Sequence, residues 1–254
     1  MKVKILNTKI LSVSKEELLE SNLSGIVVTP NIDHLMKLQN DSLFYDIYTE
    51  ADYILCDSKI IQLLSILLGT PIKEQITGSD FFPAFCEYHG NINSGKKVFL
   101  LGGTTNKIVK QSAKNINACS KGIIIGYYSP PFGFETDEVE CENIIKKIEE
   151  SGANVLAVGV GAPKQEKFIY KYKNRLTNID LFFAIGATID FESGVLPRAP
   201  KWMTKIGLEW FFRMIKDPKR LVKRYLIDDI PFFFLIFKQM IGLYKNPFVG
   251  KPKK

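Results

Sequence analysis

The stretch VLAVGVGAP, residues 155–163, decides the fold, because an unbroken apolar run passes directly into a glycine turn. A run without polar alternation is typical of a strand that is buried on both faces of its sheet. Outward from it, five more apolar runs end in clusters of Gly, Pro, Asn or Asp. They are GIVVTPN (25–31), YILCDS (53–58), VFLLGG (98–103), GIIIGYYSPP (122–131) and LFFAIGA (181–187).

Amphipathic stretches separate these runs and predict helices near residues 32–49, 58–68, 79–90, 104–118, 137–150 and 163–176. Buried strands that alternate with helices predict an α/β fold with a doubly wound, mainly parallel sheet of Rossmann-like type. Ligands of such sheets bind beyond the carboxyl ends of the strands. The polar residues of this chain fall at those ends, so we expect the turns there to form one active-site rim.

The basic charge of the chain is concentrated towards its C-terminus. The 254 residues carry a net charge of +7, yet residues 201–254 alone hold 13 Lys/Arg against 4 Asp/Glu. This change predicts an α/β catalytic domain over residues 1–199 and a basic, aromatic, helical appendage over residues 200–254. A hydrophobic fraction of 46% and a charged fraction of 24% exclude a largely disordered chain.

The appendage contains an apolar run of eight residues, from Ile230 to Phe237. A helix that spans a bilayer needs roughly 20 apolar residues, so this run is too short. Basic and aromatic residues together predict an interfacial helix on an anionic membrane surface, rather than a nucleic-acid partner. The alternative is a C-terminal helix that docks on the core and leaves its basic face in solvent.

Metal-binding patterns are absent from the sequence. The four cysteines are widely spaced, only two histidines occur, and there is no D-x-D motif, so we expect no metal and no cofactor. The N-terminal stretch MKVKILNTKILSVS lacks the apolar region of a signal peptide. We therefore expect a cytoplasmic protein that lies peripherally on the inner face of the cell membrane, and a homo-oligomer stays open.

Three residues at strand ends are candidates for catalysis. Asp57 follows the run ADYILC, where a hydrophobic wall can raise the pKa of a carboxylate enough for it to act as a general base. Thr29 and Asn31 follow the first strand and can orient a sugar hydroxyl. Each has a structural alternative, because Asp and Asn at these positions also cap helices.

Glycine turns are candidates for binding a diphosphate, since free backbone N–H groups and a helix dipole attract anions. The sequence VGVGAPKQE resembles a dinucleotide fingerprint, but Lys164 replaces its third glycine and no strand-end acid follows. That departure weakens the alternative of a nicotinamide-dependent oxidoreductase. The candidates in these turns are Gly102, Gly103, Gly161, Gln165 and Glu166.

Further candidates lie in ITGSDFF (76–82), in IGATIDFESG (185–194) and in the appendage. Asp190 can accept from the imide of a base, and guanidinium groups can bind a diphosphate in the absence of a metal. Helix starts, a turn-stabilising Asp and a solvated basic face are the structural alternatives. The residues concerned are Gly78, Ser79, Asp80, Asp190, Arg213, Arg220 and Arg224.

The ordered set VVTPNIDHL, ADYILCDS, ITGSDFF, FLLGG, YYSPPFG, GVGAPKQE, AIGATIDFESG and RAPKWMTKIGLEWFFRMIKDPKRLVKRYL resembles the WecG/TagA/CpsF glycosyltransferases, glycosyltransferase family 26. The similarity runs from about residue 5 to residue 226. It implies an inverting, metal-independent transfer from a UDP-sugar, N-acetylmannosamine-type or glucose, to a polyprenyl-diphosphate-linked acceptor of cell-surface polysaccharide or teichoic acid synthesis. A non-catalytic membrane adaptor is a further alternative.

The resemblance also implies roles for individual residues. It makes Asp57 the base, puts Thr29 and Asn31 in the sugar pocket, and puts Gln165 and Asp190 on the nucleotide side. It implies that the appendage meets the membrane and closes over the diphosphate. One departure is Gln75, which stands where many members carry Arg, so this chain lacks the positive charge that those members have at that position.

Overall fold

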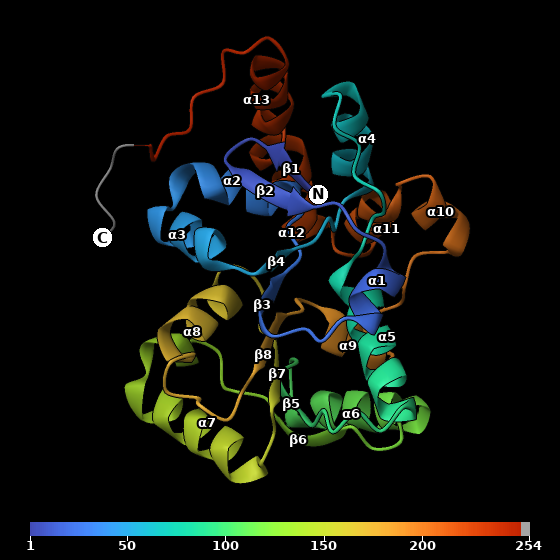
Figure 1. Ribbon diagram of the computed structural model, residues 1–254, viewed down its shortest axis with the longest axis vertical. Helices are drawn as coiled ribbons and strands as arrows, with labels where there is room; N and C mark the ends of the chain where they lie inside the picture. Colours follow the sequence, from blue (N-terminus) through green and yellow to red (C-terminus); the bar gives the residue numbers. More distant parts are fainter. Residues whose placement is uncertain (250–254) are drawn as a thin grey trace.

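The computed structural model describes residues 1–249, and of Lys201, Lys205 and Arg220 it describes the backbone alone. Its centre is a six-stranded sheet in the order β4-β3-β8-β7-β5-β6, and every pair in it is parallel (Figure 1). This confirms the predicted doubly wound α/β fold. The strands are β3 (Gly25–Val28), β4 (Tyr53–Ile54), β5 (Val98–Gly102), β6 (Ile124–Tyr128), β7 (Val155–Gly159) and β8 (Leu181–Ala184).

Two hydrophobic clusters cover the two faces of the sheet, because successive strand residues point to opposite sides. Along β7, Leu156 and Val158 belong to one cluster, whereas Val155 and Ala157 belong to the other. The first cluster takes in α2 (Ile32–Asn40), α3 (Ser42–Glu50), α7 (Glu138–Ser151) and α8 (Lys164–Tyr172). The second takes in α1 (Lys15–Glu20), α5 (Gly78–Asn91), α6 (Asn106–Ser120) and α9 (Thr188–Glu192).

The helix predicted over 32–49 is two helices, α2 and α3, and Asp41 stands between them. Its backbone is extended, it ends α2, and its carboxylate accepts from the backbone N–H of Phe44 at 3.0 Å to begin α3. Asp favours such a cap over a helix interior, because its carboxylate can satisfy an N–H of the first turn that lacks a helical partner.

A hairpin at the N-terminus was not predicted. Its strands β1 (Lys2–Ile5) and β2 (Thr8–Leu11) pair antiparallel, with Ile5 opposite Thr8. Alternate residues, Val3 and Ile5 among them, are buried in the first hydrophobic cluster. The lysines that break up this apolar stretch therefore belong to the outer face of a strand.

The appendage consists of short helices that return to the sheet. They are α10 (Lys201–Lys205), α11 (Glu209–Lys216), α12 (Pro218–Lys223), a π-helical turn over Arg224–Asp228, and α13 (Pro231–Met240). Within residues 1–249 no helix is long and apolar enough to cross a bilayer. The domain boundary near residue 199 stays a prediction.

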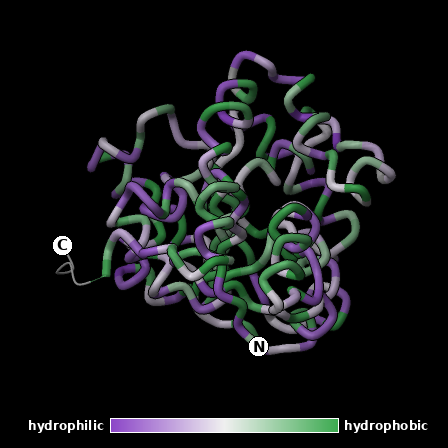
Figure 2. Tube along the Cα trace, turned by 90° about the horizontal axis from the view of Figure 1, so that it is seen from above, coloured by the Kyte–Doolittle hydropathy of each residue, from purple (hydrophilic) through white to green (hydrophobic). Residues whose placement is uncertain are grey.

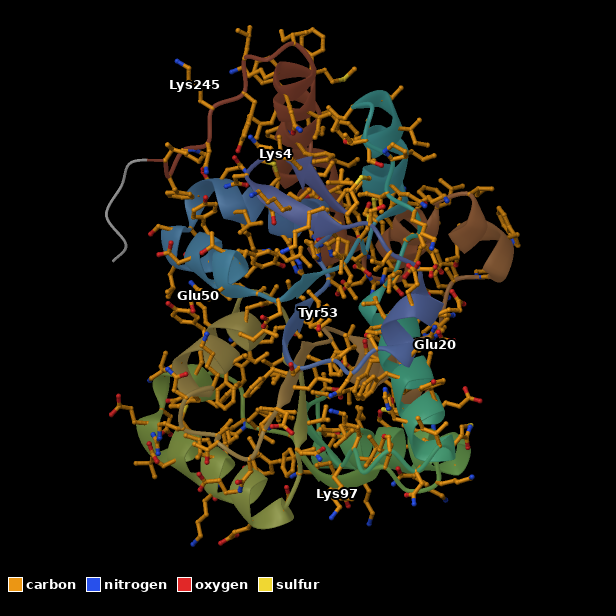
Figure 3. The ribbon with its side chains drawn as sticks, in the orientation of Figure 1. Lys4, Glu20, Glu50, Tyr53, Lys97 and Lys245 are labelled. Carbon is orange, nitrogen blue, oxygen red and sulfur yellow. The ribbon has the colours of Figure 1, made fainter. Side chains whose placement is uncertain are left out.

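Helix α13 docks on the core as well as exposing apolar side chains. Phe232 and Ile236 are buried in the first hydrophobic cluster, together with strand residues of the sheet. Gln239 accepts from the N–H of Leu6 at 2.6 Å and donates to the carbonyl of Lys4 at 2.9 Å, and Figure 3 shows Lys4 near this helix. Figure 2 shows hydrophobic stretches in outlying segments of the trace as well as in its middle.

Candidate active site

A cavity of about 1170 Å³ opens beyond the carboxyl ends of β3, β4, β5, β7 and β8, and the appendage forms its other wall. Its position is the one expected for a ligand site of a doubly wound sheet. Of the predicted site residues, the structure brings these to the cavity: Thr29, Asn31, Asp57, Gly78, Ser79, Gly103, Gly161, Gln165, Asp190, Arg213 and Arg224. Gly102, Asp80 and Glu166 are not in its lining, and the side chain of Arg220 lies outside the described part of the chain.

Asp57 is not the cap of the helix that follows it. That helix, α4 (Lys59–Leu67), begins after Ser58, whose hydroxyl accepts from the N–H of Ile61 at 3.4 Å. The backbone of Asp57 is held by its neighbours, since its N–H donates to the carbonyl of Pro30 and its carbonyl accepts from Gln75. The carboxylate of Asp57 thus does not cap α4, and it lines the cavity.

Burial raises the pKa of Asp57 to about 7, although Arg213 and a hydrogen bond from the N–H of Gly78 favour the charged form. Glu209 and Asp80 act in the opposite direction by repulsion. A carboxyl group with a pKa near neutrality can accept a proton at physiological pH and return it. Geometry and protonation behaviour both suit a general base.

Thr29 lies against the start of α5. A Cβ built on Gly78 would come within 3.0 Å of the Thr29 hydroxyl, so a larger residue would crowd this wall of the cavity. Gly78 also donates its N–H to Asp57. The glycine therefore brings the Thr29 hydroxyl and the Asp57 carboxyl to one part of the cavity.

Asn31 caps α2 and binds the appendage at the same time. Its side-chain oxygen accepts from the N–H of His34 at 3.2 Å and from Nη2 of Arg224 at 3.1 Å. Arg224 also lies 3.4 Å from a carboxylate oxygen of Asp33. The structural alternative for Asn31 is therefore realised, and it coexists with a position in the cavity wall.

Gln165 is buried and fixed from both ends. Its amide oxygen accepts from the N–H of Gly186 at 3.0 Å, and its amide nitrogen donates to Glu166 at 2.9 Å. Burial raises the pKa of Glu166 to about 7, and its second oxygen has no hydrogen-bond partner among the described residues. Glu166 thus sets the orientation of the amide that faces the cavity.

The glycine turns differ in what they contribute. Gly102 is required by packing, because a Cβ there would come within 2.4 Å of the Gly159 carbonyl oxygen. Gly161 has a φ of +85° and open space around it, so its backbone can approach a ligand. Asp190 accepts from the N–H of Thr104 at 3.4 Å and its hydroxyl at 3.3 Å, which links two of the turns.

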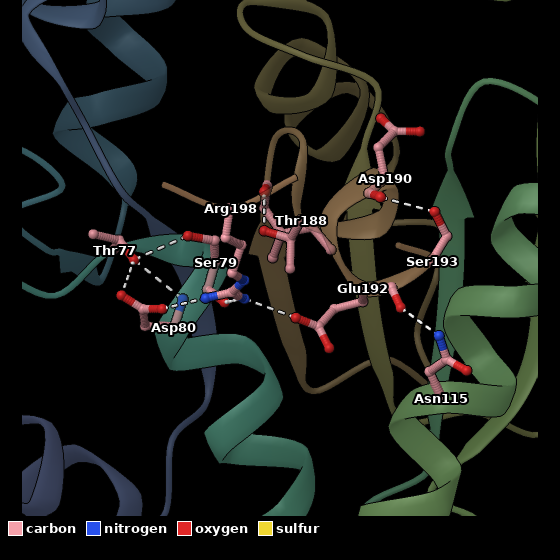
Figure 4. A network of polar contacts seen from close by, with 10 residues as sticks. Thr77, Ser79, Asp80, Asn115, Thr188, Asp190, Glu192, Ser193 and Arg198 are labelled. Carbon is pink, nitrogen blue, oxygen red and sulfur yellow. Dashed lines mark hydrogen bonds and ion pairs between the residues drawn. The ribbon is translucent and has the colours of Figure 1, made fainter. Parts of the chain in front are cut away.

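Asp80 belongs to a polar network beside the cavity, which Figure 4 shows. It accepts from Thr77 at 2.9 Å and from Arg198 at 2.5 Å, while Arg198 also binds Glu192 at 2.7 Å. The hydroxyl of Ser79 lies 3.1 Å from that of Thr77, at the start of α5. These contacts hold α5 to α9, and they correspond to the structural alternative of a helix start.

The family model of the WecG/TagA/CpsF glycosyl transferases matches residues 3–246. The chain belongs to this family. An N-acetylglucosaminyldiphosphoundecaprenol N-acetyl-beta-D-mannosaminyltransferase of Bacillus subtilis (strain 168) is 28% identical over 248 residues, 97% of this chain and 91% of the relative. A protein of the same name from Bacillus spizizenii is 26% identical over 213 residues, 84% of this chain and 79% of the relative.

Membership of a glycosyltransferase family decides between the classes that the sequence left open. The protein is a glycosyltransferase, and the oxidoreductase and adaptor alternatives are wrong. Within residues 1–249 no three His, Cys, Asp or Glu side chains are grouped so that they could hold a metal ion.

Several lining residues of this glycosyltransferase were not singled out from the sequence. Lys59 and Lys164 add positive charge, and Trp210 packs edge-on against Tyr225 with ring centroids 5.7 Å apart. Lys59 stands two residues after Asp57, and this short separation predicts that it lies near the same site. Trp210 and Tyr225 could not have been placed, because nothing local in the sequence says how the appendage folds back over the strand ends.

Proposed function

We propose that the protein transfers an N-acetylmannosamine-type sugar from a UDP-sugar, with inversion, to N-acetylglucosaminyl-diphosphoundecaprenol. The acceptor and the sugar are those in the names of the two relatives, which are similar over most of this chain. UDP as the carrier of the sugar comes from the family resemblance. The volume of the cavity suits a nucleotide-sugar together with the end of an acceptor.

The observation that carries the proposal is the Asp57 carboxyl in the cavity wall, with its pKa raised to about 7, while Ser58 caps the helix that follows. Asp57 accepts the proton of the acceptor hydroxyl while the oxygen of that hydroxyl bonds to the anomeric carbon. The bond from that carbon to the UDP oxygen breaks, and the electron pair leaves with UDP. A single displacement from the opposite face inverts the anomeric centre.

Side chains rather than a metal ion compensate the diphosphate in this proposal. Arg213, Arg224 and Lys164 line the cavity, and guanidinium groups stay charged at any physiological pH. The N–H of Gly103 is taken up by the carbonyl of Gly159 at 3.3 Å, so the backbone of Gly161, which lines the cavity and has open space around it, is the turn that can approach the diphosphate. Thr29 and Asn31 orient the sugar, and Gln165 and Asp190 bind the nucleotide.

The proposed place of action is the inner surface of the cell membrane, with peripheral attachment. The high content of Lys and Arg in residues 201–254 supports it, as do the exposed Phe233, Phe234 and Phe237. Basic charge and exposed apolar area together give stable attachment, whereas either alone is marginal.

A donor panel tests the proposal. Purified protein is incubated with UDP-N-acetylmannosamine, its uronic acid or UDP-glucose, and with a polyprenyl-diphosphate-N-acetylglucosamine analogue. We expect a disaccharide product from the first donor, detected by mass spectrometry, with the anomeric configuration read by NMR. Absence of transfer from all three donors would contradict the proposed function, and retention of configuration would contradict its mechanism.

A further inference from the structure

An apolar stripe on α4 begins in the cavity wall. Lys59 and Ile60 line the cavity, and Leu63, Ile66 and Leu67 continue their face at helical spacing. These three leucine and isoleucine side chains are 51%, 57% and 65% exposed. The stripe extends about 12 Å beyond Lys59 along the helix.

The other side of α4 packs on the protein. Ile61 and Ser65 are fully buried there, and Leu64 and Leu68 pack against the first hydrophobic cluster. The exposed stripe is therefore not required by the fold of this helix, and its apolar character needs another explanation.

Helix α13 carries a second stripe of the same kind. Ile230 and Phe233 line the cavity, and Phe237 and Ile241 follow on that face, each about half exposed. Figure 1 shows α4 and α13 rising at the same end of the molecule. Two apolar surfaces thus lead outward from one cavity.

A cation stands at the inner end of the α4 stripe. Lys59 donates from Nζ to Gln62 at 2.7 Å, and within residues 1–249 it forms no ion pair with Asp or Glu. Lys59 is therefore available to an anionic ligand group.

We infer that Lys59 and the two stripes form the subsite for the prenyl diphosphate of the acceptor, which rests on the proposed function. Lys59 binds the acceptor diphosphate, and the isoprenoid chain leaves the cavity between Leu63 and Ile66 of α4 and Phe233 and Phe237 of α13. A bilayer could cover the outer parts of both stripes. It does not account for two stripes that both start at the cavity, one of them beside an unpaired cation, whereas an amphiphile with one anionic end does.

Binding of soluble prenyl diphosphates tests the subsite without glycosyl transfer. With UDP at saturation to occupy the donor site, calorimetry gives the dissociation constants of inorganic, geranyl and farnesyl diphosphate. We expect farnesyl diphosphate to bind at least about tenfold more tightly than inorganic diphosphate. The variant L63Q/I66Q should reduce this advantage to about twofold, because it removes apolar contact while keeping good helix formers. Lys59→Gln should weaken the binding of inorganic diphosphate and of farnesyl diphosphate by a similar factor.

A matched variant, V139Q/I92Q, replaces two exposed apolar side chains away from the cavity and should leave the farnesyl advantage intact. Circular dichroism checks that all variants are folded. The subsite is refuted if chain length has no effect on binding, or if L63Q/I66Q keeps the full advantage. Loss of vesicle binding by L63Q/I66Q with an unchanged farnesyl advantage would assign the stripes to the bilayer instead. The donor panel is separate from these measurements, so a failure of the proposed function can be told apart from a failure of the subsite.

Discussion

Arg224 donates from Nη2 to the side-chain oxygen of Asn31 at 3.1 Å, although 193 residues separate them in the chain. Asn31 is at the same time the cap of α2, so its oxygen is fixed by the N–H of His34. One hydrogen bond thus joins the appendage to the turn that follows β3. It places a guanidinium at the cavity wall in a position that a flexible tail could not maintain.

Replacement of Arg224 by Met should lower kcat/KM by about tenfold to a hundredfold, because a charge-assisted contact and a cavity cation are lost together. The measurement uses a soluble acceptor, for which membrane binding is irrelevant. Arg175→Met is the control, since Arg175 pairs with Glu142 on the exposed surface and does not line the cavity. Equal kinetics for the two variants would remove Arg224 from the active site.

Asp57→Asn should lower turnover by roughly 10²–10⁴-fold with little change in UDP affinity, because it removes the base and keeps the shape. Ser58→Ala is its partner experiment. Ser58 caps α4, so this change should lower the stability of the protein by about 1 kcal/mol and preserve turnover. If Asp57→Asn instead behaves like Ser58→Ala, Asp57 acts in structure and not in catalysis.

The raised pKa of Asp57 makes the free energy of unfolding depend on pH. The folded protein holds the proton up to about pH 7, whereas the unfolded chain releases it near its ordinary value of 3.8. The native state binds more protons between these values, so stability falls as pH rises through that window. Asp57→Asn should therefore raise the free energy of unfolding at pH 8 by on the order of 1–3 kcal/mol, and the melting temperature with it. Near pH 3 the variant should leave both unchanged.

Asp57 should also set the pH dependence of the rate. In the native enzyme kcat/KM should increase with pH as Asp57 loses its proton, with an apparent pKa near 7. A profile that is flat from pH 5 to pH 9 would show that another group, or water, takes the proton.

Activity should survive excess EDTA, since Arg213, Arg224 and Lys164 line the cavity and can supply positive charge to a diphosphate. The assay compares rates in EDTA with rates after addition of Mg²⁺ or Mn²⁺. Loss in EDTA followed by recovery on adding either ion would mean that a metal neutralises the diphosphate.

Truncation after Pro197 should abolish sedimentation with anionic liposomes, because it removes the basic and aromatic segment. The truncated protein should also melt at a lower temperature, because Phe232 and Ile236 are buried in the core of the sheet domain. Loss of one such aromatic side chain costs about 3–5 kcal/mol. Persistent liposome binding by a folded truncation would place the membrane surface elsewhere.

The strands and most helices could be predicted because their signals are local. A buried apolar run such as Val155–Gly159 followed by glycine predicts a strand and its turn at once. The hairpin at Lys2–Leu11 was missed for the opposite reason. Its two four-residue strands alternate apolar residues with lysines, and so short an alternation is a weaker signal than an unbroken apolar run.

The cavity could be predicted as a rim but not as an enclosure. Parallel strands bring the turns at Asn31, Asp57 and Gly161 to one edge whatever the details of the side chains. The positions of Trp210 and Tyr225 depend on how the appendage packs over that edge. Such packing between segments far apart in the chain leaves no periodic signal in the sequence.

The hydrogen bond between Leu6 and Gln239 joins residues that are 233 positions apart in the sequence. This separation affects the order in which the parts of the site form during synthesis. The hairpin leaves the ribosome long before α13 exists to bind it, since domains form as the chain emerges. Until then the cavity lacks Phe233, Arg224 and the wall that they belong to. A nascent chain can therefore assemble its sheet early, yet it acquires a complete site for the acceptor only when the last helix has been made.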